Sequence, residues 1–284
     1  MCDYSSISPS AKGLLLMKGY TDIPFIAAAA KIVWGATTVA LGRQKLKDIT
    51  FLKRLIHFEA RYKSVDHLLH VLGGNNILEI SSGFSFRGLH YALHNPDVTY
   101  IDTDLPGVIE VKDGLINRLI KNQSLDLQGE LLVMPMNALD EDSFMKTIGL
   151  LPAGPVNIVN EGLLVYLNTD EKARLCQIIH RVLRQRGGHW ITADIYIKKD
   201  ALKLANDELS QFLQAHNVEE KKFESFEQAE QFFAGQGFKI YKKADAIAGQ
   251  LSSLKYLPIH AIDELTQQAN QIGRIRETWA LVPV

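Results

Sequence analysis

The sequence predicts an α/β fold in which a mostly parallel sheet is covered by helices. Two observations carry this prediction. From Asn76 onward, short apolar runs alternate with longer amphipathic segments, the pattern of parallel strands joined by helices. Polar and turn-forming residues follow the first two runs directly, at the strand ends where an open α/β sheet places its ligand.

Composition limits the class of protein. The 284 residues are 46% hydrophobic and 22% charged, enough for a large core with a charged surface. The 31 Lys plus Arg and 32 Asp plus Glu leave a formal charge of −1, and no basic block occurs, so nucleic acid is not an expected partner. Cys2 and Cys176 are far apart in the sequence, which fits a reducing, cytoplasmic compartment.

The start of the chain has no basic and apolar secretory signal, so we expect residues 1–284 to fold as one domain. Helical spacing of apolar residues and a stop at Gly73 and Gly74 predict a helical extension, or lid, over residues 1–75. Residues 76–284 are expected to form the α/β core. The apolar stretch 25–41 contains Lys31, and we therefore expect a buried or partner-facing helix there and no membrane span.

The core elements follow from the apolar runs and their boundaries. Residues 77–80, 98–101, 131–134, 156–159 and 190–197 are predicted as strands, and 237–244 and 277–282 as two closing strands. Helical patterns cover 105–120, 170–183, 200–213 and 225–236. Thr169 or Asp170 is expected to cap the helix that ends near Gly187 and Gly188.

The turn after the first strand runs from Glu79 to Gly88. Gly83 would let the backbone approach a ligand closely, although a tight strand-to-helix turn explains it equally well. Asp104 follows about 20 residues later, at the spacing where nucleotide-binding folds place a ribose-binding acid. It could instead cap the helix that begins at Pro106.

The same turn argues against a dinucleotide. A pyrophosphate needs a Gly-x-Gly-x-x-Gly turn, and Ser81 and Phe86 stand where two of those glycines belong. A nucleoside cofactor without a pyrophosphate fits better than NAD. The pairs His67 with His70 and His90 with His94 have no acidic partner in a zinc-protease pattern, so no metal site is expected.

The motifs in this order resemble the leucine carboxyl methyltransferase family, a branch of the class I S-adenosylmethionine-dependent O-methyltransferases that includes polyketide-type enzymes. The resemblance spans much of residues 10–183. The family's Glu-x-Asp-x-Pro is similar to the segment from Asp102 to Pro106, and its Glu-Gly-Leu-x-x-Tyr-Leu to the segment from Glu161 to Leu167. Single-residue matches are Lys12 seven residues before Gly19-Tyr20, Arg61 ahead of the first strand, and Lys112.

The resemblance implies a Rossmann-like fold with a seven-stranded, mostly parallel sheet and an antiparallel last strand. It also implies S-adenosylmethionine as the cofactor, and Glu79 matches the acid that many class I enzymes carry at that strand end. The implied contacts are Lys12 and Arg61 with the methionine carboxylate, Gly83 with the methionine moiety, Asp104 with the ribose, Asn137 and Ala138 with the adenine, and Glu161 with the amino group.

Structural alternatives exist for several of these residues. Lys12 could be a solvated helix charge and Arg61 a surface ion-pair partner. Glu161 could be satisfied by backbone groups, and Tyr166 could be a core residue.

The resemblance implies an O-methyltransferase that acts on a carboxylate or hydroxyl of a small metabolite. Arg61 and Tyr166 would orient a carboxylate, which needs no base, whereas a hydroxyl requires a base that the sequence does not identify. Ser81, Ser85 and Phe86 depart from the family's Leu-Gly-x-Gly-x-Asp-Thr-Arg loop. A protein C-terminal carboxyl methyltransferase and a non-catalytic cofactor-binding or scaffold protein therefore stay open as alternatives.

Overall fold

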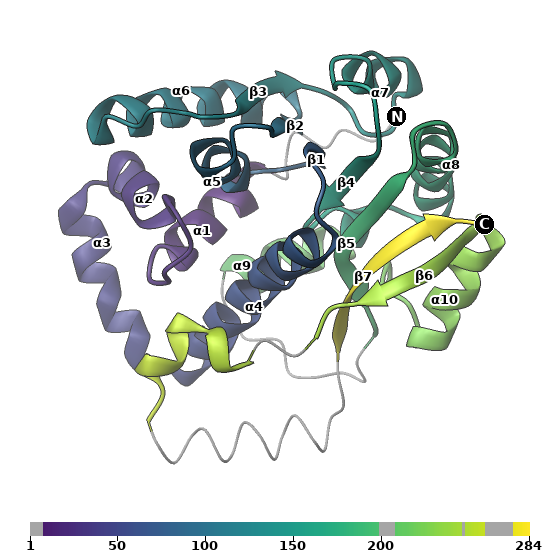
Figure 1. Ribbon diagram of the computed structural model, residues 1–284. Coiled ribbons are helices and arrows are strands. Elements are labelled where there is room, and N and C mark those ends of the chain that lie inside the picture. Colours follow the sequence, from purple (N-terminus) through teal and green to yellow (C-terminus); the bar gives the residue numbers. More distant parts are fainter. Residues whose placement is uncertain (1–7, 199–207, 246–247, 259–274) are drawn as a thin grey trace.

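The computed structural model of the protein describes residues 8–198, 208–245, 248–258 and 275–284 (Figure 1). A seven-stranded sheet runs through these residues in the order β3-β2-β1-β4-β5-β7-β6. Its strands are β1 (Asn76–Ile80), β2 (Thr99–Asp104), β3 (Glu130–Pro135), β4 (Val156–Asn160), β5 (Gly188–Tyr196), β6 (Phe238–Lys243) and β7 (Arg276–Pro283). β7 pairs antiparallel with β5 and β6, while β1 to β5 pair in parallel. The predicted fold class is confirmed.

The strand order places a ligand crevice in the middle of the sheet. The chain moves outward from β1 through β2 to β3 and then returns to β4 on the other side of β1. Parallel open sheets bind ligands at such a reversal, beyond the carboxyl ends of the strands. The turns that the sequence analysis singled out after β1, β2 and β4 therefore meet at one edge.

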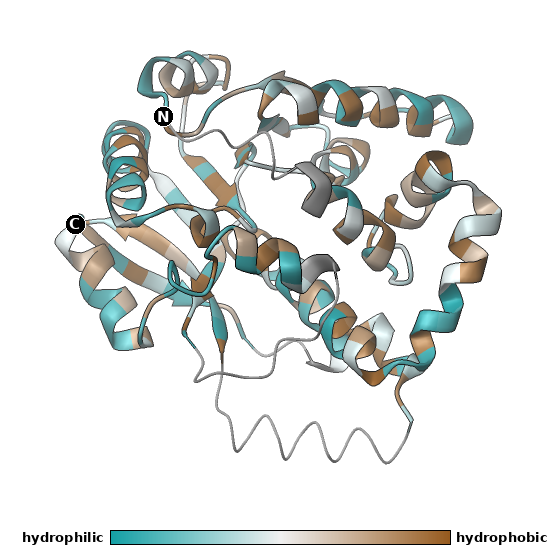
Figure 2. Cartoon of the chain, turned by 180° about the vertical axis from the view of Figure 1, so that it is seen from behind, coloured by the Kyte–Doolittle hydropathy of each residue, from teal (hydrophilic) through white to brown (hydrophobic). Residues whose placement is uncertain are grey.

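Helices cover both faces of the sheet (Figure 1). One face carries α4 (Ile49–Leu72), α5 (Arg87–His94) and α6 (Pro106–Gln123), and the other carries α7 (Glu141–Ile148), α8 (Thr169–Arg186) and α10 (Phe226–Gly235). Successive strand residues point to opposite faces, so Ile77 packs with the α4 side and Leu78 with the α8 side. Figure 2 shows brown hydrophobic residues along the strands between these layers.

Shorter helices precede α4. They are α1 (Ser8–Lys18), α2 (Ile26–Trp34), α3 (Ala36–Gly42) and the 3-10 turn η2 (Arg43–Lys47). Gly35, at φ +80°, divides the apolar stretch 25–41 between α2 and α3, and Ile26 and Ala29 of α2 are buried. No helix within the described ranges is long and apolar enough to cross a membrane. α1 packs on α4 and α2 packs on α6, and residues of α1 line the crevice.

Side-chain caps fix where the core helices begin. The predicted cap of α8 was one or two residues late, because Asn168 accepts a hydrogen bond from the Glu171 N–H at 2.9 Å, and the Glu171 carboxylate accepts one from the Asn168 N–H at 2.9 Å. This reciprocal capping box satisfies two N–H groups that the first turn leaves unpaired. α8 ends at Gly187, which has φ +72°.

The remaining elements lie near the carboxyl half. Of the predicted helix 200–213, residues 200–207 lie outside the described residues, and α9 (Glu208–Ala215) continues it. The 3-10 turns are η3 (Leu164–Tyr166), η4 (Ala248–Gln250) and η5 (Ser252–Tyr256). Glu59 of α4 is fully buried and accepts backbone hydrogen bonds from Ser252 and Ser253, which fastens η5 to α4.

Candidate active site

A cavity of about 580 Å³ lies beyond the carboxyl ends of the parallel strands, and α1 and α4 contribute to its wall. Its lining includes the loop after β1, the end of β2, the loops after β3 and β4, and the last residue of β5. With the exception of Lys12, every site residue predicted from the sequence lies in this lining: Arg61, Glu79, Gly83, Asp104, Asn137, Ala138, Glu161 and Tyr166.

The structure places Lys12 outside the cavity, as the alternative of a solvated helix charge had it. Lys12 is exposed on α1 and does not line the cavity, whereas Lys18 of the same helix is buried and does. The two residues are six positions apart, which places them about 120° apart around a helix with 3.6 residues per turn. Lys18 stands directly before Gly19 and Tyr20. Because it lines the cavity and Lys12 does not, Lys18 is the lysine that α1 brings to the site.

Asp104 ties the first two strand ends together. Its Oδ2 atom accepts a hydrogen bond from the backbone N–H of Gly83 at 2.7 Å, and its Oδ1 atom accepts one from the N–H of Leu105 at 2.7 Å. Burial raises the pKa of the Asp104 carboxyl, and the two backbone donors oppose that rise. Asp104 does not cap α6, whose N-cap position is Leu105. The carboxylate is held in one orientation at the cavity wall.

Ser81, Ser85 and Phe86, in the loop after β1, lie in three different environments. Ser81 adopts the left-handed conformation at φ +52°, which costs an ordinary residue about 1–2 kcal/mol relative to glycine. Phe86 is fully buried against Leu15 and Leu89 and is not part of the cavity lining. Ser85 lines the cavity, and its hydroxyl donates to Glu79 at 3.4 Å. Of the three, Ser81 and Ser85 face the cavity.

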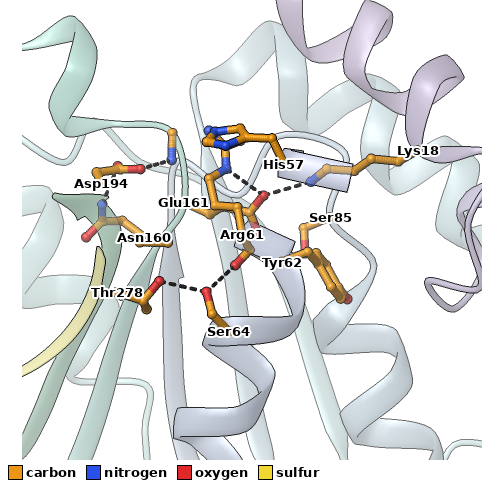
Figure 3. A network of polar contacts seen from close by, with 12 residues as sticks. Lys18, His57, Arg61, Tyr62, Ser64, Ser85, Asn160, Glu161, Asp194 and Thr278 are labelled. Carbon is orange, nitrogen blue, oxygen red and sulfur yellow. Dashed lines mark hydrogen bonds and ion pairs between the residues drawn. The ribbon is translucent and has the colours of Figure 1, made fainter. Parts of the chain in front are cut away.

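Glu161 is the centre of a buried cluster of charges (Figure 3). Its Oε1 atom lies 2.7 Å from Nζ of Lys18 and 3.1 Å from Nε of Arg61, and its Oε2 atom lies 3.1 Å from a guanidinium nitrogen of Arg87. Arg87 is itself buried between Glu79 and Asp66. The cluster joins α1, α4, α5 and two strand ends.

The charges in this cluster stabilise one another. Burial alone would raise the pKa of the Glu161 carboxyl, but Lys18, Arg61 and Arg87 outweigh it and hold that pKa well below its usual range. Burial lowers the pKa of the Lys18 ammonium, although the Glu161 charge opposes this. Glu161 is therefore a carboxylate at neutral pH. An ammonium has three donors and a guanidinium five, so Lys18 and Arg61 have more donors than their contacts with Glu161 use.

The loop that carries Glu161 is fixed by Asp194 of β5. The Asp194 carboxylate accepts backbone hydrogen bonds from Gly162, Leu163 and Leu164 at 2.7, 2.7 and 3.1 Å. It also accepts one from the Asn160 side chain at 2.8 Å, as Figure 3 shows. The Glu-Gly-Leu motif therefore has a defined conformation because a buried acid holds its backbone. No signal in the sequence singled out Asp194.

The β3 side of the cavity has a different character. Ala138 and Met136 are buried there, and Asn137 folds back so that its side-chain oxygen accepts from the N–H of Leu139 at 3.0 Å. Leu105 and Val108 also line the cavity. This part of the wall is mostly apolar with a few backbone and amide groups, which suits a flat heterocycle.

The β4 and β5 side holds the aromatic residues. Tyr166 lines the cavity, and its ring packs against Phe212 and His216 of α9, so core packing and a cavity role coexist in this residue. Tyr196 at the end of β5 and His57 of α4 also line the cavity, with 2.7 Å between the Tyr196 oxygen and Nε2 of His57. The sequence analysis missed both, together with Lys18.

No protein-family model matches the sequence, and no curated protein is a significant relative. Among solved structures, the mitomycin 7-O-methyltransferase MmcR aligns with a TM-score of 0.49 and 11% identity, over 85% of this chain and 60% of that chain. A family 2 O-methyltransferase from Planctomyces limnophilus in complex with apigenin aligns with a TM-score of 0.46 and 14% identity. This alignment covers 92% of this chain and 68% of that chain.

LepI in complex with SAH and a substrate analogue aligns with a TM-score of 0.46 and 13% identity, over 76% of this chain. That alignment covers 46% of the LepI chain, so the present chain spans about half its length. Similarity at this level concerns the fold alone.

Proposed function

We propose that this chain is an S-adenosylmethionine-dependent O-methyltransferase that acts on a carboxylate or hydroxyl of a small metabolite. The observation that carries the proposal is the pairing of two features in one cavity. Asp104 presents an oriented carboxylate beside Gly83, and Lys18 and Arg61 present two cations around Glu161. This is the set of groups that a ligand with a diol, a carboxylate and an ammonium requires.

Each polar part of the cofactor has a candidate partner. Asp104 would accept hydrogen bonds from the ribose hydroxyls, and Lys18 and Arg61 would bind the methionine carboxylate. Oε2 of Glu161 accepts one described hydrogen bond, from Arg87, and an oxygen of a carboxylate can accept two, so it can receive the ammonium. Asn137 and Ala138 would flank the adenine, and Gly83 would lie against the methionine chain.

The chain's own residues would act mainly by positioning. When bound, S-adenosylmethionine supplies an electrophilic methyl group on a sulfonium. In-line transfer needs the acceptor oxygen at about 3–3.5 Å from the methyl group and exclusion of water. The apolar lining at Leu14, Leu163 and Val165 would exclude water, while Arg61 and Tyr166 would orient a carboxylate acceptor.

A test is to incubate the protein with S-adenosylmethionine that carries a labelled methyl group, together with a small-molecule extract and, separately, a peptide library. Label in the small-molecule fraction is the expected result. Label in peptides alone would favour a protein C-terminal carboxyl methyltransferase. Absence of both transfer and cofactor binding in a folded sample would favour the scaffold alternative.

A further inference from the structure

We propose that Tyr196 and His57 form a proton relay that deprotonates the methyl acceptor, and that the acceptor group is therefore a hydroxyl and not a carboxylate. The proposal rests on the proposed function and selects one of its two acceptor classes. Tyr196 is the candidate catalytic residue because it can touch the acceptor. His57 acts through Tyr196.

The geometry brings together two residues that are 139 positions apart. Tyr196 is the last residue of β5, and His57 lies on α4, which packs across β5. The distance from Nε2 of His57 to the Tyr196 hydroxyl oxygen is 2.7 Å, a length at which a proton passes directly between them. Both side chains line the cavity, so the contact is not sealed inside the core.

The place of the pair within the cavity fits the acceptor. The groups assigned to the nucleoside lie at the ends of β2 and β3, whereas Tyr196 lies at the end of β5, next to the Glu161 loop. Arg61 connects the two regions, because its Nε atom contacts Glu161 and its NH1 atom lies 3.5 Å from the Tyr196 oxygen. A sulfonium sits between the ribose and the methionine chain, so its methyl group would lie between the Asp104 region and the Lys18 and Arg61 region, in the cavity that Tyr196 also lines.

Charged groups of both signs surround the Tyr196 side chain. Arg61 of α4 contacts the Tyr196 oxygen, Nζ of Lys222 lies 5.9 Å from the Tyr196 ring, and Arg276 pairs with Tyr196 in the register of β5 and β7. The opposing acids are Glu161, which is paired with Lys18 and Arg61, and Asp194, which is bonded to backbone N–H groups. The cations are engaged as well, Arg61 with Glu161, Lys222 with Glu219 and Arg276 with Thr278, so the 2.7 Å contact with His57 is the observation that carries the relay.

The proposed step is balanced in atoms and charge. The acceptor oxygen forms a bond to the methyl group as the sulfur–methyl bond breaks, and the bonding electron pair remains on sulfur. The acceptor's proton passes to the Tyr196 oxygen while the Tyr196 proton passes to Nε2 of His57. The resulting imidazolium then releases a proton to solvent. A carboxylate acceptor brings no proton, and for it the relay would have no task.

The first experiment needs no methyl transfer. We would titrate 4-nitrophenol into the complex with S-adenosylhomocysteine and record phenolate absorbance against pH. The relay predicts that bound 4-nitrophenol ionises at lower pH than the free probe, and that Tyr196→Phe and His57→Gln abolish this shift. Tyr241→Phe is the matched control, because Tyr241 is 60% exposed and also lies beside a histidine, His189. A probe that fails to bind, or a shift that survives in Tyr196→Phe, would overturn the proposal.

The second experiment uses matched acceptors, 2-naphthol and 2-naphthoic acid, with labelled S-adenosylmethionine. We expect label on the naphthol and a loss of about 100-fold or more in kcat for Tyr196→Phe, the contribution typical of general acid–base catalysis. His57→Gln should remove the acid limb of the pH profile. Label confined to the naphthoic acid would overturn the relay. The affinity of each variant for S-adenosylhomocysteine, measured by calorimetry, distinguishes failure of the relay from failure of the proposed function. If the relay alone is wrong, wild type and variants still bind S-adenosylhomocysteine, whereas absence of binding to wild type would contradict the proposed function.

Discussion

Nζ of Lys18 lies 2.7 Å from Oε1 of Glu161, which connects α1 to the loop after β4 across 143 positions of the sequence. Both groups are buried, and Arg61 contacts the same oxygen. The helical extension is thus joined to the sheet by charged groups that line the cavity. The position of the extension and the proposed carboxylate site therefore depend on the same contacts.

Replacing Lys18 tests which lysine of α1 serves the site. Lys18→Met should weaken the affinity for S-adenosylmethionine at least about tenfold, because a hydrogen bond to a charged partner contributes about 1.5–3 kcal/mol. Lys12→Met is the matched control on the same helix and should leave the affinity unchanged. Calorimetry measures the affinity of both variants for S-adenosylmethionine, and thermal unfolding verifies that both are folded. Equal losses in both variants would contradict the assignment.

Asp104→Ala should also lower cofactor affinity at least about tenfold, since it removes a charged acceptor for two hydroxyl donors. It frees the N–H of Gly83 as well, so the loop after β1 loses its tether to β2. Asp113→Ala, at an exposed position of the following helix, serves as the control. An unchanged affinity in folded Asp104→Ala would remove the ribose assignment.

The depressed pKa of Glu161 predicts a dependence of stability on pH. The Glu161 carboxyl has a lower pKa in the folded state than in the unfolded state. Its carboxylate therefore stabilises the fold fully at pH values above the ordinary pKa of 4.5, and this contribution is lost as the pH falls below 4.5 toward the folded-state pKa. The free energy of unfolding of wild type should therefore exceed that of Glu161→Gln most at neutral pH. Urea unfolding between neutral pH and about pH 3 should show the difference narrowing. A constant difference over that range would argue against a buried carboxylate.

The capping box of α8 provides a test of the fold. Asn168→Ala should lower the free energy of unfolding by about 1 kcal/mol, the usual effect of losing an N-cap. Thr169→Ala, one position later and exposed, should have little effect. Denaturant titration distinguishes them, and a larger loss for Thr169→Ala would restore the cap expected from the sequence alone.

Elements with strong local patterns were predictable from the sequence. The five parallel strands contain apolar runs followed by turn residues, and each of the seven strands falls within a few residues of its predicted position. The motif residues also follow strand ends, so parallel pairing brings Gly83, Asp104 and Glu161 together without further information.

Residues that depend on tertiary packing were not predictable in the same way. His57 and Tyr196 meet only because α4 lies across β5, and no local pattern encodes that crossing. Which lysine of α1 lines the cavity, Lys12 or Lys18, depends on how α1 is rotated against α4. Both lysines precede Gly19 and Tyr20 closely, so the sequence alone does not distinguish them. Asp194 bonds to backbone groups 30 to 32 positions away, a role that is visible only once the loop is folded.

The most direct test of the account is calorimetric titration of the purified protein with S-adenosylmethionine and S-adenosylhomocysteine, with NAD as the control. We predict saturable binding of the first two with affinities of about micromolar, and no binding of NAD, because the turn after β1 lacks the glycines that a pyrophosphate needs. Binding of NAD, or no binding of either sulfur compound to a folded sample, would contradict the central claim.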